Sequence, residues 1–467
     1  MIKIRFERVN TCKECGYSCK GMNVCEPVKK SMRRYNGVRF TADGFDCALP
    51  VAVDSHSICS YECLYCFTDN IFGHREASKK NEPGQTSLVT LENIFSGRPG
   101  KFADLVRMAL KYDNRNENGF PCPIQLGAIC DPMDNIERQQ GWLLDFIKLC
   151  NKYDQPVRIS TKGNLFLTDE YLDAISEKPH LYWVAFSIIT PDDERLARID
   201  RYAPNATERL KSMERLSERG VKTSLRFRPL IPGLSDSTPK HPKAYKELIE
   251  RAAEAGAKAI STEVAFVPGM MTKEMRRKWR EIEQITGVPL VQIYKSFGKN
   301  QACIRPAYTW TEGIMHAVVE EAKKNGLTVG VSDPVWKQLT ETGSCCGILP
   351  DDPVFGNWQR ESATNRLLEA KQTGKEIRSK DIIPPWAYHQ TKQGMCSVNA
   401  GPRTIYQGRH YMWSDELRDS WNDLEKERGA LSYFQGALIP VRKEGEEVIF
   451  KYKGLERQHL DAPYWKL

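Results

Sequence analysis

The sequence lacks the features of a membrane or exported protein. No apolar run reaches the roughly 18 residues that cross a bilayer as a helix. The first residues, MIKIRF, contain no apolar segment of the kind found in a secretion signal. Low-complexity tracts and internal repeats are also absent. We therefore expect a cytoplasmic protein with no membrane partner, and the length of 467 residues predicts two or three domains.

The charge is small and of mixed sign. Lysine and arginine total 68 against 60 aspartates and glutamates, which gives a formal net charge of +8. A diffuse charge of this size supports nucleic-acid binding only weakly. Apolar residues make up 40 % of the chain and charged residues 27 %, as in ordinary globular domains, which excludes a disordered or fibrous protein.

Cysteine, in contrast, is abundant: the chain has 15. An odd number without a secretion signal argues against a disulfide scaffold, because the cytosol keeps thiols reduced. Metal sites, catalytic thiols and buried small side chains remain. The spacing of the cysteines distinguishes these possibilities. Four cysteines lie within residues 12–25, three lie within residues 59–66, and two are adjacent, Cys345 and Cys346. Cys150 lies on an apolar stripe at helical spacing and is predicted to be buried.

Short apolar segments alternate with amphipathic helices from residue 51 to about residue 270. The expected strands are Val51–Asp54, Ile124–Ile129, Val157–Thr161, Trp183–Ile189, Lys222–Leu230 and Ala259–Val267. Their apolar, partly β-branched character is typical of strands buried on both faces. One intervening helix has a capping-box pattern at Asn205 and Glu208 and ends at Gly220. Six such units predict an α/β fold, a partial (β/α)6 TIM-like barrel, whose active site lies at the C-terminal ends of the strands.

The pattern divides the chain into three expected parts. Residues 1–50 form a cysteine-rich segment with a metal site, and residues 51–290 form the barrel core. Residues 291–467 form a C-terminal extension that binds substrate. Helices are expected at 311–325 and near 414–428, and a strand at Leu327–Ser332.

Cys59, Cys63 and Cys66 form a C-x3-C-x2-C motif directly after the first expected strand. Three thiolates on a short loop can hold three irons of a [4Fe–4S] cluster and leave the fourth iron open. Zinc is the alternative, with His56 or His74 as a fourth ligand. The position at the mouth of the barrel favours the cluster.

This motif, with Tyr65 before its last cysteine, resembles the signature of the radical SAM superfamily. Four further segments resemble the branch of that superfamily that contains spore photoproduct lyase: Gly127–Pro132, Ile159–Gly163, Ala185–Ile188 and Arg226–Asp236. The resemblance implies an enzyme whose open iron binds S-adenosylmethionine. One electron then cleaves this cofactor to a 5′-deoxyadenosyl radical that removes hydrogen from a substrate. It also implies an electron donor of the flavodoxin or ferredoxin type.

The same resemblance implies roles for individual residues. Lys162 would pair with the methionyl carboxylate of the cofactor, and Ser187 would donate a hydrogen bond to it. Asp131, with Tyr65, is a further candidate contact. Arg226 and Arg228 alternate along their strand and would share a face, where they could bind the carboxylate or a substrate phosphate. The alternative for Lys162 is a lysine at the rim of the barrel without a role in binding, and the alternative for the arginines is an ordinary salt bridge.

The chain departs from the lyase at one position. The lyase has a hydrogen-donating cysteine at the position that matches Ala128 in this chain, and Cys130 follows two residues later. On a strand, that shift would keep the side chain on the same face, so Cys130 could still donate hydrogen or could merely line the site. The departure puts thymine-dimer repair itself in doubt.

The remaining cysteines suggest further sites. Cys12, Cys15, Cys19 and Cys25 suffice for an auxiliary [4Fe–4S] cluster, which we favour slightly, or for a zinc knuckle. Cys345 and Cys346 could join Cys303 and Cys396 in another cluster, place a thiol in the active site, or be buried.

The substrate is expected to be a thymine-derived base in DNA. Arginines and aromatic residues interleave near the C-terminus, as in surfaces that bind phosphates and bases; they are Trp386, Tyr388, Arg403, Tyr406, Arg409, His410, Tyr411 and Trp413. These residues are equally compatible with a C-terminal extension that packs on the barrel and does not bind nucleic acid. With the resemblance, this favours an isomerase that rearranges a modified thymine of the kind bacteriophages make, or a lyase. If the protein is phage-encoded, the expected compartment is the host cytoplasm. The alternatives are a radical SAM enzyme acting on a peptide or small metabolite, and a zinc-dependent nucleic-acid-binding protein without catalysis.

Overall fold

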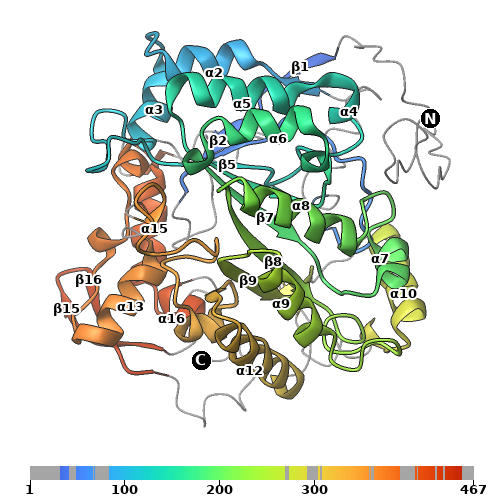
Figure 1. Cartoon of the computed structure of the whole chain (residues 1–467). Coiled ribbons are helices and arrows are strands. Elements are labelled where there is room, and N and C mark those ends of the chain that lie inside the picture. Colours follow the sequence, from blue (N-terminus) through green and yellow to red (C-terminus); the bar gives the residue numbers. More distant parts are fainter. Residues whose placement is uncertain are drawn as a thin grey trace. The chain divides into compact units, whose positions relative to one another are not determined.

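The structure is a computed structural model of the whole chain (Figure 1). It describes residues 32–40, 49–66, 68, 84–268, 273–291, 303–304, 308–356, 358, 362–389, 405–406, 409–425, 429–434 and 437–454. The chain forms two compact units, and each is built from several segments. The first comprises residues 1–38, 53–92 and 125–327, and the second comprises residues 39–52, 93–124 and 328–467. The three-part division expected from the sequence stays a prediction.

Six strands follow one another in the central sheet, and the last four of them along the chain lie wholly in the first unit. They are β3 (Val51–Val53), β5 (Ile124–Leu126), β6 (Val157–Thr161), β7 (Tyr182–Ser187), β8 (Lys222–Leu230) and β9 (Ala259–Val264). Their order in the sheet is β9-β8-β7-β6-β5-β3, and the pairs β6–β7, β7–β8 and β8–β9 are parallel. The α/β class and the partial barrel expected from the sequence are thereby confirmed.

Helices lie between and after these strands along the chain, and α8 and α9 pack on β7 and β8 (Figure 1). They are α2 (Leu88–Phe95), α4 (Glu137–Gln140), α5 (Trp142–Tyr153), α6 (Asp169–Ser176), α7 (Asp193–Ile199), α8 (Ala206–Glu218), α9 (Ala244–Glu254), α10 (Lys273–Thr286) and α12 (Tyr308–Lys324). A short strand β1 (Arg33–Tyr35) pairs in parallel with β4 (Gly84–Thr86). No described helix has the length and apolar character needed to cross a membrane.

Local sequence explains several of these boundaries. Every residue of β6 and β7 is buried, as expected for strands covered on both faces. Helix α8 begins with the expected capping box, in which Asn205 accepts from the amide of Glu208 and Glu208 accepts from that of Asn205. Its C-terminal turn leads into Gly220, whose φ is +78°. Cys150 is fully buried on α5, as the apolar stripe predicts.

Strand β5 is shorter than expected, and this corrects one prediction. It ends at Leu126 because Gly127 has a φ of +78°, and a side chain at Gly127 would lie 2.5 Å from the carbonyl oxygen of Ser160. Residues 128–130 therefore lie on a loop. The argument that Ala128 and Cys130 share a strand face is wrong for this reason.

The second unit contains strand β12 (Thr328–Val331) and the hairpin β15 (Leu438–Glu444) and β16 (Glu447–Tyr452), with a shorter pair β13 (Ile405–Tyr406) and β14 (Arg409–His410). Its helices are α3 (Lys101–Ala109), α13 (Ala363–Thr373), α15 (Trp413–Asn422) and α16 (Ala430–Phe434). Trp421 packs edge-on against Phe450, with ring centroids 4.8 Å apart, and its indole donates to the carbonyl of Val448. The helix expected near 414–428 is α15, which ends earlier because Asp423 adopts an extended conformation.

Candidate active site

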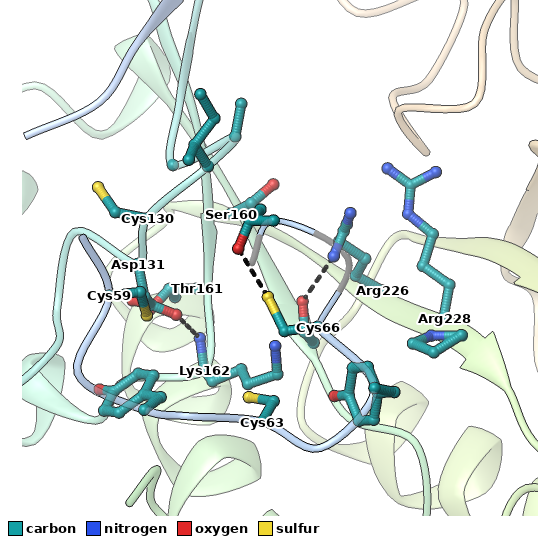
Figure 2. Close-up of a pocket in the computed structure, with 18 of the residues that line it drawn as sticks. Cys59, Cys63, Cys66, Cys130, Asp131, Ser160, Thr161, Lys162, Arg226 and Arg228 are labelled. Carbon is teal, nitrogen blue, oxygen red and sulfur yellow. Dashed lines mark hydrogen bonds between the residues drawn. The ribbon is translucent and has the colours of Figure 1, made fainter. Parts of the chain in front are cut away.

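A cavity of about 240 Å³ opens at the C-terminal ends of the six central strands (Figure 2). The loop after β3 contributes the three cysteines, and the loop after β5 contributes Gly127–Asp131. The last residues of β6, β7 and β8 add Ser160, Thr161, Ser187, Arg226 and Arg228, and Glu263, Phe266 and Trp279 complete one wall. The cavity lies where parallel α/β folds place their active sites.

Cys59, Cys63 and Cys66 all line this cavity as free thiols. Their loop is fixed by hydrogen bonds from Ser60 N to Asp134 Oδ2, 2.7 Å, and from Tyr61 Oη to the carbonyl of Met133, 2.6 Å. These bonds hold the loop in one conformation without involving the three sulfur atoms.

Burial and nearby carboxylates raise the pKa values of two of these thiols. For Cys59, burial acts first and the charges of Asp134 and Asp131 add to it. For Cys63, burial is followed by the charge of Asp200. Thiolates at these positions need a compensating positive charge, which bound iron supplies.

The donor set fits an iron–sulfur cluster better than a single zinc ion. A zinc site gathers its ligands around one point. Among the described residues, no group of three Cys, His, Asp or Glu side chains is arranged in that way. In a cubane cluster each thiolate binds a different iron, so the three sulfur atoms do not need to point at one common centre. Of the two histidines considered as a fourth zinc ligand, His56 is fully buried and is not among the cavity-lining residues. Its Nδ1 lies 2.9 Å from Ser55 Oγ, and burial lowers its pKa to about 4. The other, His74, lies outside the described residues.

Asp131 links the loops after β5 and β6. Its Oδ2 accepts from the backbone N–H of Lys162 at 2.6 Å, and its Oδ1 accepts from Thr161 Oγ1 at 2.7 Å and from Met133 N at 3.0 Å (Figure 2). Both carboxylate oxygens therefore hold the protein together. Contact between Asp131 and a cofactor, expected from the sequence, stays a prediction.

Lys162 places an ammonium group beside the cysteine loop. Its Nζ lies 5.4 Å from the centre of the Tyr65 ring, within the range of a cation–π contact. Burial alone would lower its pKa, but the charges of Cys63 and Asp200 outweigh burial and raise it. The side chain is therefore a permanent cation in the cavity, suited to a carboxylate ligand.

Arg226 and Arg228 bring two guanidinium groups to the opposite wall (Figure 2). Arg226 Nη1 donates to Ser187 Oγ at 3.2 Å, and Arg228 Nη1 lies 3.7 Å from Glu263 Oε2. Burial, followed by the charges of Arg228 and Arg158, lowers the pKa of Arg226 to about 9. The Nε of Arg226 is buried without a hydrogen-bond partner in the described part of the chain. The guanidinium is thus charged at neutral pH at an energetic cost, which a bound anion would relieve.

Cys130 also lines the cavity, although only 3 % of it is exposed. Its Sγ lies 3.5 Å from Ser55 Oγ. The backbone amides of residues 128, 129 and 130 all point at Asp54 Oδ1, at 3.0, 2.8 and 3.4 Å. Burial, with the charge of Asp54, raises the pKa of Cys130, so this residue is a thiol rather than a thiolate at neutral pH.

Three buried carboxylates that shape the site, Asp54, Asp134 and Asp200, were not expected from the sequence. Asp54 orders the Cys130 loop, and Asp134 orders the cysteine loop; burial raises the pKa of Asp134 to about 7. Asp200 forms a fully buried ion pair with Arg209, 2.8 Å long, whose guanidinium also donates to the carbonyl of Ser187. Of these carboxylates, only Asp54 could have been suspected from the sequence, because it directly follows an apolar strand.

Other expected site residues lie elsewhere. Cys12, Cys15, Cys19, Cys25, Cys396 and Arg403 lie outside the described residues, as do the side chains of Cys303, Tyr406, Arg409 and His410. Cys345 and Cys346 belong to the second unit and are not among the described residues that line the cavity. Trp386 stacks on Phe40 at 5.0 Å, and Tyr411 Oη donates to Asp419, so these rings pack within the second unit.

Residues 54–241, which span the cysteine loop and the four strands β5 to β8, match the radical SAM superfamily. The chain carries a radical SAM domain. Members of this superfamily use S-adenosylmethionine and a [4Fe–4S] cluster.

Two solved structures are similar to parts of this chain. Spore photoproduct lyase in complex with a dinucleoside spore photoproduct has a TM-score of 0.45 and 16 % identity over 64 % of this chain and 80 % of the lyase. Streptococcus suis SuiB bound to S-adenosylmethionine has a TM-score of 0.36 and 10 % identity over 61 % of this chain and 50 % of SuiB. Among curated proteins, none matches the sequence.

Proposed function

We propose that this radical SAM enzyme acts on a thymine-derived base in DNA, either rearranging a modified thymine or cleaving a thymine-derived lesion. The observation that carries the proposal is the grouping of a protonated thiol, Cys130, with the guanidinium groups of Arg226 and Arg228 in the cavity of the three cysteines. The cations suit a substrate with phosphate groups, and the thiol suits a reaction in which a substrate radical regains hydrogen.

The residues around the cavity divide into cofactor and substrate groups. Cys59, Cys63 and Cys66 would ligate the cluster, and Lys162 would bind the carboxylate of S-adenosylmethionine, with a hydrogen bond from Ser187. When bound, these cofactors supply the 5′-deoxyadenosyl radical. Many of the side chains that line the cavity are buried, which limits the access of water to a carbon radical.

Arg226 and Arg228 would bind a phosphate next to the reacting base. Their bidentate donors match phosphate oxygens, and the unpartnered Nε of Arg226 offers a further donor. Ser187 and Glu263 orient the two side chains from the neighbouring strands β7 and β9.

Cys130 would return a hydrogen atom to the substrate. Its S–H bond breaks and a C–H bond forms on the substrate radical, which leaves a sulfur radical on Cys130. The sulfur radical would regain a hydrogen atom from the 5′-deoxyadenosine formed in the first step, which would return the 5′-deoxyadenosyl radical. The conversion of the substrate is then redox-neutral, as a rearrangement or a lyase reaction requires.

The test is incubation of the anaerobically reduced enzyme and S-adenosylmethionine with DNA that carries modified thymines. A change in the nucleosides, detected by mass spectrometry after digestion, supports the proposal. Unchanged nucleosides while S-adenosylmethionine is still cleaved contradict it and favour a peptide or small-metabolite substrate.

The four N-terminal cysteines form a separate part of the proposal. We propose that Cys12, Cys15, Cys19 and Cys25 hold an auxiliary [4Fe–4S] cluster, because four closely spaced thiols complete one cluster without any other ligand.

A further inference from the structure

A second hollow, of about 760 Å³, lies between α7 and α10 in the first unit. Its lining is strongly basic: Arg198, Lys273, Arg276, Arg277 and Arg280 surround it with Glu281 and Gln284. We call this set the α7–α10 groove. Figure 1 shows the two helices side by side.

The single carboxylate of the groove is already neutralised. Glu281 Oε2 lies 2.6 Å from Arg201 Nη2 and 3.5 Å from Arg277 Nη1. Arg198, Arg276 and Arg280 are exposed. The groove therefore presents an excess of positive charge to a partner, which attracts acidic surfaces over a distance of about a Debye length, ~8–10 Å at physiological salt.

The back of the groove is joined directly to the cysteine loop. The amide of Leu64, which lies between Cys63 and Cys66, donates to the carbonyl of Ile199 at 3.0 Å, and Ile199 follows Arg198 in the chain. The amide of Tyr202 in turn donates to the carbonyl of Tyr61 at 3.3 Å. Ile199 and its hydrogen bond to Leu64 thus link Arg198 of the groove to the loop that would hold the cluster.

Helix α10 contributes residues to both sites. Trp279 is 2 % exposed and lines the cysteine cavity, while its neighbour Arg280 and, three residues earlier, Arg276 line the groove. A protein seated in the groove would therefore come close to the cysteine loop without entering the substrate cavity.

We propose that the α7–α10 groove is the docking site of a small acidic protein that delivers one electron from a flavin or an iron–sulfur centre. In this step the donor is oxidised by one electron and the cluster in the Cys59–Cys66 loop is reduced by one electron. Electron transfer falls steeply with distance, so a docking surface directly behind the cluster loop favours it. The inference rests on the cluster assignment but not on the identity of the substrate.

Nucleic acid is the other polyanion that a basic groove could bind, and two observations disfavour it. None of the described residues that line the groove is aromatic, so no ring is available on which a base could stack. The groove cations are also not among the residues that line the substrate cavity. A donor needs only proximity to the cluster, whereas a DNA substrate must reach the cavity itself.

The experiment compares two double variants. Arg276→Glu with Arg280→Glu reverses two exposed charges of the groove. Lys148→Glu with Lys211→Glu reverses two exposed charges on α5 and α8, outside both the groove and the cavity, and serves as the matched control. Both are compared with wild type for binding of an oxidised acidic flavodoxin, measured by fluorescence anisotropy at low and high salt. S-Adenosylmethionine cleavage is measured with reduced flavodoxin and, separately, with dithionite.

The groove variant should bind flavodoxin about tenfold more weakly at low salt and lose a similar factor in donor-driven cleavage, with the difference shrinking at high salt. Cleavage with dithionite should equal that of wild type, and the control variant should match wild type throughout. Unchanged flavodoxin binding, or an equal loss with dithionite, would overturn the proposal. Weaker binding of DNA with unchanged flavodoxin binding would also overturn it and assign the groove to nucleic acid. Failure of dithionite to support cleavage in wild type would instead count against the cluster assignment.

Discussion

The carboxylate of Asp131 accepts a 2.6 Å hydrogen bond from the backbone N–H of Lys162, and this bond ties the loop after β5 to the end of β6. It fixes the backbone from which the Lys162 side chain reaches toward Tyr65. Because the other oxygen of Asp131 holds Thr161 and Met133, the carboxylate positions three neighbours at once. Asp131 is therefore a positioning residue for the lysine that would bind the cofactor carboxylate.

Replacing Asp131 with asparagine should weaken binding of S-adenosylmethionine. An amide has one accepting oxygen where the carboxylate uses two, so one donor loses its partner at a buried site. We expect a loss of about 1–3 kcal/mol in unfolding free energy and roughly tenfold weaker cofactor binding, measured by urea unfolding and by anaerobic equilibrium dialysis. Asp169→Asn, whose side chain is 82 % exposed on α6, should change neither. Normal cofactor binding in the Asp131 variant would contradict the positioning role.

The sequence predicted the fold better than it predicted the groups that support the site. The strands Val157–Thr161 and Lys222–Leu230 were located to the residue because each is a short segment with apolar or β-branched side chains that lies between two helices. The cysteine loop was located because its ligands are close in sequence. Asp54 and Asp134 were missed because their partners lie 74 to 76 residues away, and no local period marks a carboxylate that accepts amide hydrogens across the fold.

Replacing Cys130 with serine should separate cofactor cleavage from product formation. The substitution keeps the size of the side chain, but an O–H bond is too strong to give hydrogen to a carbon radical. We expect S-adenosylmethionine cleavage within about twofold of wild type, which is below half a kcal/mol, and loss of the normal product. In D2O, wild type should place one solvent deuterium in the product, because the thiol exchanges with solvent. Cys122→Ser, at a buried thiol not among the cavity-lining residues, should retain the product and its deuterium. Deuterium-labelled product from the Cys130 variant would show that another group donates the hydrogen.

Breaking the buried ion pair of Asp200 and Arg209 should be costly. The two side chains are 1 % and 0 % exposed and 2.8 Å apart, so Arg209→Met leaves an unpaired buried carboxylate. We expect unfolding free energy to fall by about 3–5 kcal/mol in urea titrations. Arg219→Met, which removes an exposed pair with Asp173 near the end of the same helix, should cost less than about 1 kcal/mol. Equal costs for the two variants would show that burial does not control the strength of the first pair.

Glu137 should make the protein less stable as the pH rises. Its Oε1 accepts from Leu143 N at 2.9 Å and from Tyr171 Oη at 2.7 Å, whereas its Oε2 is buried without a partner among the described residues. Burial raises its pKa from 4.5 to about 8, so between these values the folded state holds a proton that the unfolded state has released. The stabilisation is complete below pH 4.5 and is lost as the pH rises through about 8. Burial also raises the pKa of Asp134, from 3.8 to about 7, so Asp134 likewise makes the folded state less stable as the pH rises between these values.

Urea unfolding of Glu137→Gln isolates the contribution of this residue. Glutamine keeps the accepting Oε1 but does not ionise, so the variant should lose less stability than wild type between pH 5 and pH 8. Glu218→Gln, at an exposed position on α8, should follow wild type at every pH. Parallel curves for wild type and Glu137→Gln would contradict a raised pKa at Glu137.

Iron analysis with the two cysteine groups mutated separately tests both cluster assignments. Wild-type protein purified without oxygen should hold roughly eight irons, and replacing Cys59, Cys63 and Cys66 with alanine should leave roughly four. Replacing Cys12, Cys15, Cys19 and Cys25 should also leave roughly four, while cleavage of S-adenosylmethionine continues. Zinc in place of four of the irons would contradict the N-terminal cluster only. The cavity cluster would be contradicted if iron stayed at the wild-type level after loss of the Cys59 group, because Cys130 is the one other cysteine among the described residues that line the cavity.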